Sequence, residues 1–503
     1  MLKKFSKKLI LMTTLMIGCA FSLNGCNTET SQGLSTNSNV NANENSEKVV
    51  LTMWHYYNGN TKDMLDNMIK EFNETVGAEK NIQVDAYSFS RVSDLASALI
   101  SSANKEVGVD DMPDIFSAYS DTALVLNDMG ILANIDDYLT NDEMELFRQD
   151  FLEEGRFGNE GNLKILPVAK STEILFINET DFKIFAEETS IDINLLETWE
   201  GLAEAGEIYY NWTDDKTPDI PNDGQALFGI DSEANFMLVL AKQLGEEMYD
   251  YSDYDNITFG LSEESAKKIW DYYITPYIKG YYVSYGNFRS DDVKSGDLLM
   301  YAGSTSSVYY FPEQVELGRI DAYNIEGIAL PYPYFEDGKK VGVQQGAGML
   351  VTKSEEIREA GAVEFLKWFT SPEYNIEFAV STGYMPVQNN ALSYNSVLEV
   401  MPKYSIYDTS NIVQESIRIT YNDMLPEYEF YANKPFNGSY DTRNVIADSI
   451  LDILEYSMKE LKEQLDLGVN KEEVIEQLIS EESFKSWYNG FEISINKILE
   501  ENK

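Results

Sequence analysis

The sequence predicts an α/β fold, in which strands and helices alternate along the chain. Short runs rich in β-branched and aromatic residues alternate with longer segments whose apolar residues recur every third or fourth position. The joints between them are short and contain Asn, Gly, Asp and Pro. Such alternation favours a mainly parallel sheet covered by helices on both faces. A chain of 503 residues is long enough for two or three lobes with separate cores.

The first group of elements begins at residue 48. Residues 48–57, KVVLTMWHYY, are expected to form a strand, and residues 58–60 a turn. A helix follows from about Thr61, because one apolar stripe recurs there at Met64, Met68, Phe72 and Val76. A second strand, a second helix and a third strand are expected over 81–89, 94–104 and 112–120.

The alternation resumes after residue 162. Residues 163–182 predict a strand, and a helix is expected around Trp199–Tyr210 before a joint rich in Asp at 213–224. Ser354 is a suitable N-cap for a helix to Thr370, and the next helix begins at Pro372. Further strands are expected over 297–305, 325–334 and 344–354, and an almost wholly helical region over 443–503.

The N-terminus has the layout of a secretory signal. Lys3, Lys4, Lys7 and Lys8 precede an apolar run that ends near Leu23, and this run is too short to span a bilayer. Leu23-Asn24-Gly25-Cys26 resembles the lipobox of bacterial lipoproteins, in which the Cys thiol receives a diacylglycerol; Met16-Ile17-Gly18-Cys19 is the alternative. We expect a signal peptide at 1–25, acylation of Cys26, and a disordered tether at 26–47.

The composition excludes several classes of function. The net charge of −47 argues against a nucleic-acid partner and against adsorption to anionic lipid, which favours a covalent membrane anchor. His55 is the only histidine, so a catalytic triad or a multi-histidine metal site would depend on this one residue. Residues 249–257 are acidic but lack the spacing of an EF-hand loop. We predict no cofactor and no essential metal.

Five segments in order resemble a known family, the extracellular solute-binding proteins of bacterial ABC importers, family 1, of the maltodextrin-binding type. Glu179 departs from the family pattern, which has Lys there, and the segment before Ala226 is longer than usual. The segments are LTMWHYYNG (51–59), 112–139, LPVAKSTEILFINETDF with ETWEGL (166–202), VKSGDLLMYAGSTS (293–306), and 343–387 ending in TGYMPV.

The resemblance implies two α/β lobes of the type II periplasmic-binding-protein fold, joined by crossing strands, with a ligand cleft between them. Lobe 1 is expected to comprise 48–166 and 304–353, and lobe 2 to comprise 167–303 and 354–503 with a helical C-terminal extension. The implied function is that of a monomeric, non-enzymatic lipoprotein on the outer face of the cytoplasmic membrane. It would capture a sugar or oligosaccharide and deliver it to ABC permease subunits.

Candidate ligand contacts lie at the ends of the expected strands. His55, Tyr57 and Asn58 follow the first strand, whereas Tyr119 and Asp121 follow the third, where Asp121 serves either as a hydroxyl acceptor or as a helix cap. Phe236 and Tyr384 are candidate aromatic platforms for a sugar ring by alignment with the family. The other expected contacts, at the crossings and on the late strand, are Ser171, Thr172, Gly303, Ser304, Gln344, Gln345 and Gly346.

Two alternatives remain open at this stage. FNGSYDTRNVI (436–446) resembles the late segment of the glycerol-3-phosphate and glycerophosphodiester binders, which would make Arg443 a phosphate ligand, although the tryptophan that these members carry near 231–236 is missing. A secreted glycan-degrading enzyme would need two carboxyl groups about 5 Å or about 6.5–9.5 Å apart. With 85 acidic residues the sequence neither locates nor excludes such a pair.

Overall fold

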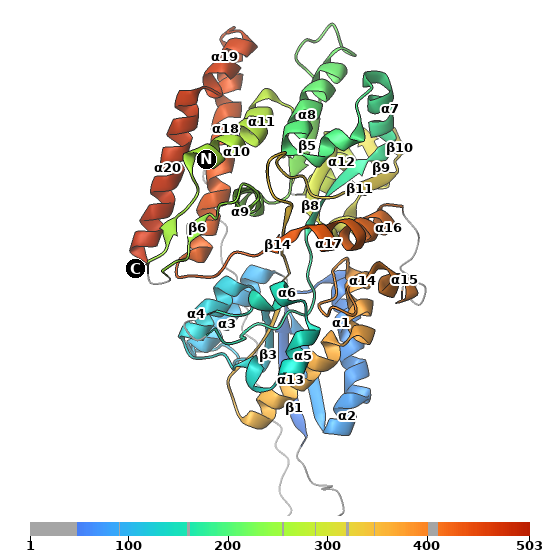
Figure 1. The fold of residues 1–503 in the computed structure, drawn as a ribbon, viewed down its shortest axis with the longest axis vertical. Coiled ribbons are helices and arrows are strands. Elements are labelled where there is room, and N and C mark those ends of the chain that lie inside the picture. The colour runs from blue at the N-terminus through green and yellow to red at the C-terminus, as the bar shows by residue number, and fades with distance from the viewer. Residues whose placement is uncertain are drawn as a thin grey trace, which may run out of the picture. The chain divides into compact units, whose positions relative to one another are not determined.

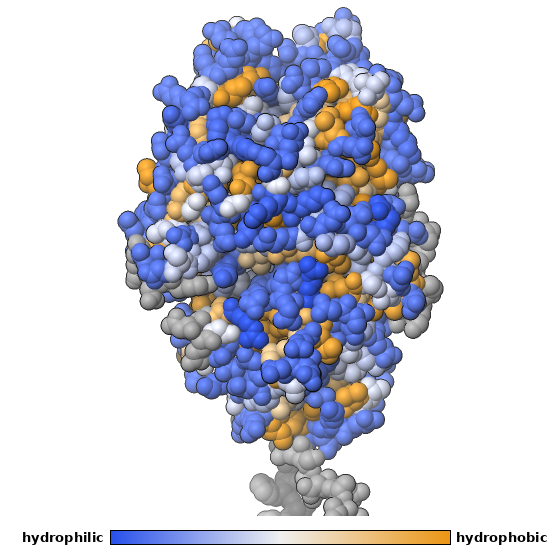
Figure 2. Space-filling view, in the orientation of Figure 1, coloured by the Kyte–Doolittle hydropathy of each residue, from blue (hydrophilic) through white to orange (hydrophobic). Residues whose placement is uncertain are grey.

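A computed structural model describes residues 48–502 apart from 90, 158–160, 254–255, 287, 318–320, 347 and 401–410. The expected signal peptide, the acylation site Cys26, its alternative Cys19 and the tether lie outside the described residues. Within the described ranges, every helix is too short or too polar to span a lipid bilayer. The face of the molecule in Figure 2 is mostly hydrophilic with separate hydrophobic patches, in keeping with the acidic composition.

The first lobe is built on a four-stranded sheet of order β13-β3-β1-β2 (Figure 1). Strand β1 pairs in parallel with β2 and β3, and β13 is antiparallel to β3. Leu51 and Met53 of β1 alternate with less buried neighbours, as the period of a half-covered strand requires. The strands are β1 (Val49–His55), β2 (Ile82–Ser88), β3 (Ile115–Ala118) and β13 (Gly348–Val351).

Helices cover both faces of this sheet. The stripe predicted on the first helix is confirmed at Met68 and Phe72, which α1 buries together with Leu65 and Ile69, whereas Met64 is only partly buried and Val76 lies beyond the end of α1. The cluster around Leu99 and Phe116 fills the opposite face beneath α3 and α4. The helical elements here are α1 (Gly59–Glu74), α2 (Val76–Lys80), α3 (Val92–Ala103), α4 (Ser120–Asp128), η1 (Ile135–Asp137), α5 (Asn141–Leu146), α6 (Gln149–Glu153), α13 (Glu356–Thr370), α14 (Pro372–Thr382) and α15 (Tyr394–Val400).

The second lobe is built on a sheet of order β11-β4-β8-β5. Here β5 and β8 are parallel, but β4 is antiparallel to both β8 and β11, so the expectation of a mainly parallel sheet is wrong for this lobe. The reason is that β4 enters the sheet directly from the other lobe rather than through a crossover helix. The strands are β4 (Glu173–Asn178), β5 (Ala226–Ile230), β8 (Leu298–Ser304) and β11 (Gly327–Leu330).

The remaining elements of the second lobe surround this sheet (Figure 1). The predicted C-terminal helical region is confirmed: α18 packs against α9 and α20. The elements are α7 (Glu179–Thr189), η2 (Ile193–Glu197), α8 (Trp199–Asp214), α9 (Glu233–Gln243), β6 (Tyr249–Asp250), β7 (Thr258–Phe259), α10 (Glu263–Ile269), the π-helical turn η3 (Trp270–Ile274), α11 (Thr275–Lys279), α12 (Arg289–Ser295), β9 (Gln314–Leu317), β10 (Asp321–Asn324), α18 (Ser439–Asp466), α19 (Lys471–Leu478) and α20 (Glu481–Glu501).

Parts of two segments lie in a different lobe from the one expected, whereas β13 and α18 lie in the expected lobes. The sequence assigned 304–353 to lobe 1, but β11 pairs with β4 of the second sheet. It assigned 354–503 to lobe 2, but α13 packs on β1 and α14 packs on α1 of the first lobe. In both cases a contact between residues far apart in the sequence decides the lobe. An edge strand can pair with either sheet, and an apolar helix face can pack on either, so the local sequence does not determine which lobe the element joins.

Crossing strands join the lobes, as expected. Ser171 on the first crossing pairs with Gln345 on the second, and Lys170 pairs with Met385. The second crossing begins at β12 (Val341–Val343), which is parallel to β14 (Glu429–Tyr431). The other elements near these connections are η4 (Thr305–Tyr310), α16 (Asn411–Arg418), the π-helical turn η6 (Ile419–Met424) and α17 (Leu425–Glu427).

Candidate functional site

A cavity of about 820 Å³ is lined by residues of both lobes and of the second crossing strand. This volume lies in the range of small-molecule binding sites, which are commonly found between domains. The lining comprises Val92, Ser93, Ala96, Ser97 and Ile100 of α3; Tyr119 to Thr122 and Val125 at α4; Glu154; Asn235 and Leu238 of α9; Val343 to Gln345; and Tyr431 to Pro435, Ser439, Tyr440, Arg443 and Asn444 around the start of α18.

The first-lobe wall combines an apolar stripe with a helix start. Val92, Ala96 and Ile100 follow one another at helical spacing on α3, so they form one face toward the cavity. Tyr119 is the N-cap of α4 and its side chain is 37% exposed. Asp121 lines the cavity without being the N-cap, and its Oδ1 accepts a hydrogen bond of 2.6 Å from the backbone N–H of Thr122.

The second-lobe wall is more polar and carries positive charge. Lys434 and Arg443 both line the cavity. Arg443 Nη2 donates a hydrogen bond to Asn235 Oδ1, which links α18 to α9. Gly438, at φ 89°, is the N-cap of α18, and no described side chain caps the first turn of this helix. Ser439 N–H donates to the carbonyl of Phe436, and the start of the helix adds partial positive charge on the same side of the cavity.

The crossing strands place two buried carboxyl clusters at the floor of the cavity. In the first, the lysine cluster, Lys170 is only 1% exposed and its Nζ donates to Glu154 Oε2 at 2.6 Å and to the carbonyl of Gly346 at 2.8 Å. Gln344 Nε2 donates to the same Glu154 oxygen. Gly346 is required here, because its φ is +98° and a Cβ would lie 2.6 Å from the carbonyl oxygen of Ala169.

The second, the glutamate cluster, surrounds a carboxyl group that is paired with amides. Glu173 is 4% exposed, and its Oε1 accepts from Asn235 Nδ2 at 2.8 Å and from Gln345 Nε2 at 2.9 Å. Burial raises the pKa of Glu173 to about 7, although the hydrogen bond from Asn235, the charge of Arg443 and the hydrogen bond from Gln345 act in the opposite direction. The cluster consists of Glu173, Asn235, Gln345 and Arg443.

The structure gathers five of the predicted contacts in this cavity, namely Tyr119, Asp121, Gln344, Gln345 and Arg443. His55, Tyr57 and Asn58 lie elsewhere. His55 is fully buried at the end of β1, where its Nδ1 accepts from the backbone N–H of Tyr57 at 3.2 Å and burial lowers its pKa to about 4. The ring of Tyr57 packs against Phe378, and Asn58 is the exposed N-cap of α1.

The remaining predicted contacts are core or backbone positions rather than lining residues. Phe236 has no exposed surface, and its ring centroid lies 4.3 Å from that of Tyr273, so it packs in the core. Ser171 exchanges backbone hydrogen bonds of 3.0 and 2.9 Å with Gln345. Thr172 and Gly303 are buried beside it at the crossing, Ser304 caps η4, and Gly346 belongs to the lysine cluster.

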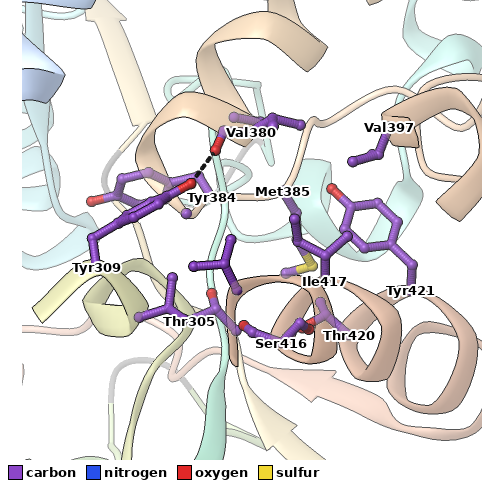
Figure 3. Close-up of a pocket in the computed structure, with 14 residues that line it drawn as sticks. Thr305, Tyr309, Val380, Tyr384, Met385, Val397, Ser416, Ile417, Thr420 and Tyr421 are labelled. Atoms are coloured by element: carbon purple, nitrogen blue, oxygen red, sulfur yellow. Dashed lines mark hydrogen bonds between the residues drawn. The ribbon is translucent and has the colours of Figure 1, made fainter. Parts of the chain in front are cut away.

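Tyr384 lines a second cavity of about 20 Å³, which lies among η4, the end of α14, α16 and η6 (Figure 3). Tyr309 on η4 donates a hydrogen bond of 2.7 Å to the carbonyl of Val380 on α14 across one side of this space. The volume is enough for about one water molecule. This cavity is therefore too small for a solute.

Sequence reasoning missed Glu154, Glu173, Asn235 and Lys434. Glu173 lies inside the crossover segment that carried the family resemblance, and Asn235 directly precedes the chosen Phe236. For these two residues the available signal was a charged or amide group inside an otherwise apolar run, since such groups are buried only with hydrogen-bonding partners. Within the described residues, no group of three or more His, Cys, Asp and Glu side chains is arranged to hold a metal ion.

Comparison with known proteins decides the family. Residues 67–399 match the bacterial extracellular solute-binding protein family, which is more than half of the chain. The chain belongs to this family. No curated protein matched in a sequence comparison.

Several solved structures share the fold of this solute-binding protein. The cyclic α-maltosyl-1,6-maltose binding protein of Arthrobacter globiformis aligns with a TM-score of 0.64 and 18% identity over 90% of this chain and 99% of that one. UgpB of Mycobacterium tuberculosis in complex with glycerophosphocholine gives 0.60 and 16%, over 87% and 98%. A Listeria monocytogenes ABC substrate-binding protein in complex with cycloalternan gives 0.60 and 14%, over 88% and 100%. The predicted two-lobed α/β fold is thereby confirmed.

Proposed function

We propose that this protein is the receptor of an ABC importer and that it captures a sugar or oligosaccharide in the cavity of about 820 Å³. The observation that carries the proposal is the composition of the cavity wall, to which both lobes and the second crossing strand contribute. A solute that contacts both walls stabilises the closed arrangement only, so binding can drive a hinge motion that a permease recognises. The protein acts by binding and leaves the solute chemically unchanged.

The side chains of the cavity suit a polyhydroxylated solute. Gln344 is 6% exposed, and its Oε1 has no hydrogen-bond partner among the described residues, so a solute hydroxyl can supply the missing donor. Asp121 adds a carboxylate acceptor on the opposite wall. Tyr119 and Tyr440 offer aromatic faces for the C–H surface of a sugar ring. A few polar groups on a partly apolar wall are the usual means by which such sites orient a ligand.

A glycerophosphodiester is the second candidate solute. Arg443, Lys434 and the uncapped start of α18 lie on one wall of the cavity, and together they favour an anionic group. One structural neighbour was solved with glycerophosphocholine. The net charge of −47 opposes an anionic solute, and it is the reason that a neutral carbohydrate ranks first.

Isothermal titration of the purified full-length protein distinguishes these candidates. We expect heat of binding with maltotriose or with cyclic α-maltosyl-1,6-maltose, and unchanged sugar on chromatography afterwards. Arg443→Gln should abolish any glycerophosphocholine binding and weaken sugar binding less, with Arg418→Gln, at a partly exposed position of α16 outside the cavity, as the control for loss of a positive charge. Hydrolysis of either sugar, or binding of glycerophosphocholine alone, contradicts the carbohydrate proposal.

We further propose that the receptor is a monomer held at the outer face of the cytoplasmic membrane by acylation of Cys26. Metabolic labelling with a radioactive fatty acid tests the anchor. Label should be lost in Cys26→Ala and retained in Cys19→Ala. The reverse pattern assigns the lipid to Cys19, and label in both variants contradicts a single lipid anchor.

A further inference from the structure

We propose that Glu173 is a positioning residue of the cavity, which holds the amide groups of Asn235 and Gln345 in one orientation and aligns Arg443 through Asn235. Glu173 itself is not among the residues that line the cavity, whereas the other three are. The effect on solute binding rests on the proposed function. The effect on the amide groups does not.

The hydrogen bonds fix which end of each amide faces the carboxyl group. Asn235 Nδ2 and Gln345 Nε2 both donate to Glu173 Oε1, at 2.8 and 2.9 Å. An amide nitrogen only donates and an amide oxygen only accepts, so an ionised Glu173 admits one orientation of each group. Asn235 Oδ1 is then turned to accept from Arg443 Nη2. The oxygen of Gln345 remains for a donor on the solute.

The charges around Glu173 come from several elements. Arg443 on α18 favours its ionised form, and Asp231 at the end of β5 opposes it. The phenol of Tyr332, which follows β11, is fully buried, and the negative charge of Glu173 adds to the effect of burial in raising the pKa of Tyr332. Asp231 is itself engaged, because its Oδ1 accepts a hydrogen bond of 2.8 Å from the backbone N–H of Arg289. Arg443 is thus the cation among these groups, and its charge lowers the pKa of Glu173.

Ionisation of Glu173 changes how firmly the two amides are held. Because its pKa is raised to about 7, both forms are populated near neutral pH. Hydrogen bonds to a carboxylate are roughly twice as strong as those to a neutral acceptor. Protonation therefore loosens Asn235 and Gln345, and it also removes the negative charge that is linked to Arg443 through Asn235. A neutral carbohydrate should bind more weakly at acid pH for this reason.

The ligand-independent test is the NMR spectrum of the side-chain amide groups in the full chain without added sugar. The signals of Asn235 and Gln345, assigned with Asn235→Ala and Gln345→Ala, should shift with pH through a midpoint near neutrality. Glu173→Gln keeps the shape of the side chain but cannot ionise, so this shift should vanish. Glu173→Asp keeps the charge, so the shift should persist with a displaced midpoint. Glu200→Gln is the matched control, since Glu200 is partly buried on α8 and its pKa is also raised by burial.

The binding test uses maltotriose at about pH 8 and about pH 5.5. Affinity should fall about three- to tenfold at the lower pH in the natural protein and in Glu200→Gln, and stay level in Glu173→Gln. Amide signals that ignore pH, or that titrate equally in Glu173→Gln, overturn the positioning role whatever the protein binds. Amide signals that titrate while no sugar binds support the positioning role and count against the carbohydrate function instead.

Discussion

The lysine cluster and the glutamate cluster lie at the same floor but differ in what balances their carboxyl groups. Glu154 meets a cation directly, because Lys170 Nζ lies 2.6 Å from its Oε2. Glu173 meets two neutral amides, and the nearest positive group, Arg443, reaches it through Asn235. The first is an ion pair between crossing strand and first lobe, whereas the second is a single buried acid linked to the cavity wall.

The difference separates a structural role from a functional one. A buried ion pair resists the loss of either partner, because removal leaves an uncompensated charge. A buried carboxyl without a direct cation is costly when ionised, so the fold loses stability at the pH at which the carboxylate organises the amides. Such a cost is expected at a binding site, where stability is exchanged for positioning.

The largest expected effect comes from breaking the ion pair of the lysine cluster. Lys170→Met should reduce the free energy of unfolding by about 3 kcal/mol, since Glu154 loses its cationic partner and the carbonyl of Gly346 loses its donor. Urea denaturation at constant pH measures this change. Adding Glu154→Gln should restore part of the loss, which identifies the unpaired charge as its cause.

The matched control for this substitution is Lys183→Met. The side chain of Lys183 on α7 is exposed and pairs with Glu179 at 2.9 Å, so its loss should change stability little. Equal losses of unfolding free energy in Lys170→Met and Lys183→Met would mean that burial does not make the Lys170–Glu154 pair more important for stability than an exposed pair. The comparison between the two clusters would then fail.

The second effect is the pH dependence of stability that Glu173 causes. Its pKa is raised from 4.5 to about 7 on folding, so the folded state holds this proton more tightly than the unfolded state. Stability from this group is fully present below about pH 4.5 and is lost as pH rises to about 7. Glu173→Gln should therefore stabilise the protein by roughly 3 kcal/mol at pH 8 and not at pH 4.5, as thermal denaturation would show.

The effect of His55 must be removed from that measurement, because its titration changes stability with pH in the opposite direction. Burial lowers its pKa from 6.5 to about 4, so its contribution is present above pH 6.5 and is lost as pH falls toward 4. The two slopes oppose each other between about pH 4.5 and 6.5. His55→Asn should expose the fall due to Glu173, and a stability profile that still lacks this fall would contradict the raised pKa.

Local patterns predicted the fold well where one element decides its own structure. The stripe on α1, the short strand β3 and the C-terminal helices follow from apolar periodicity within single segments. The lobe boundaries could not be predicted in this way. Strand β11 pairs with β4 across about 150 residues, and no local feature of either strand indicates which strand it pairs with. The N-cap of α13 is Glu355 rather than Ser354, a shift of one residue, and Ser354 N–H instead donates to the side chain of Glu359 in the first turn of this helix.

The site was predicted in part for the same reason. Gln345 and Arg443 lie in segments that resemble the family, and both line the cavity. Glu173 and Asn235 become partners only through folding, since they are 62 residues apart in the chain. His55 ends its strand as expected, but the sequence could not show that neighbouring residues would bury it fully.

The smallest effect distinguishes the two adjacent glutamines of the floor. Both line the cavity and both donate their amide N–H to a carboxyl group, Gln344 to Glu154 and Gln345 to Glu173. Truncation of either to Ala should weaken maltotriose binding about threefold to tenfold at pH 8, because one hydrogen-bonding group is lost. Only Gln345→Ala should also reduce the dependence on pH, since Asn235 alone then responds to Glu173, whereas Lys170 neutralises the partner of Gln344. Titration calorimetry at two pH values measures the affinity for maltotriose and its dependence on pH. If the pH dependence falls in Gln344→Ala instead, the titrating group lies in the lysine cluster.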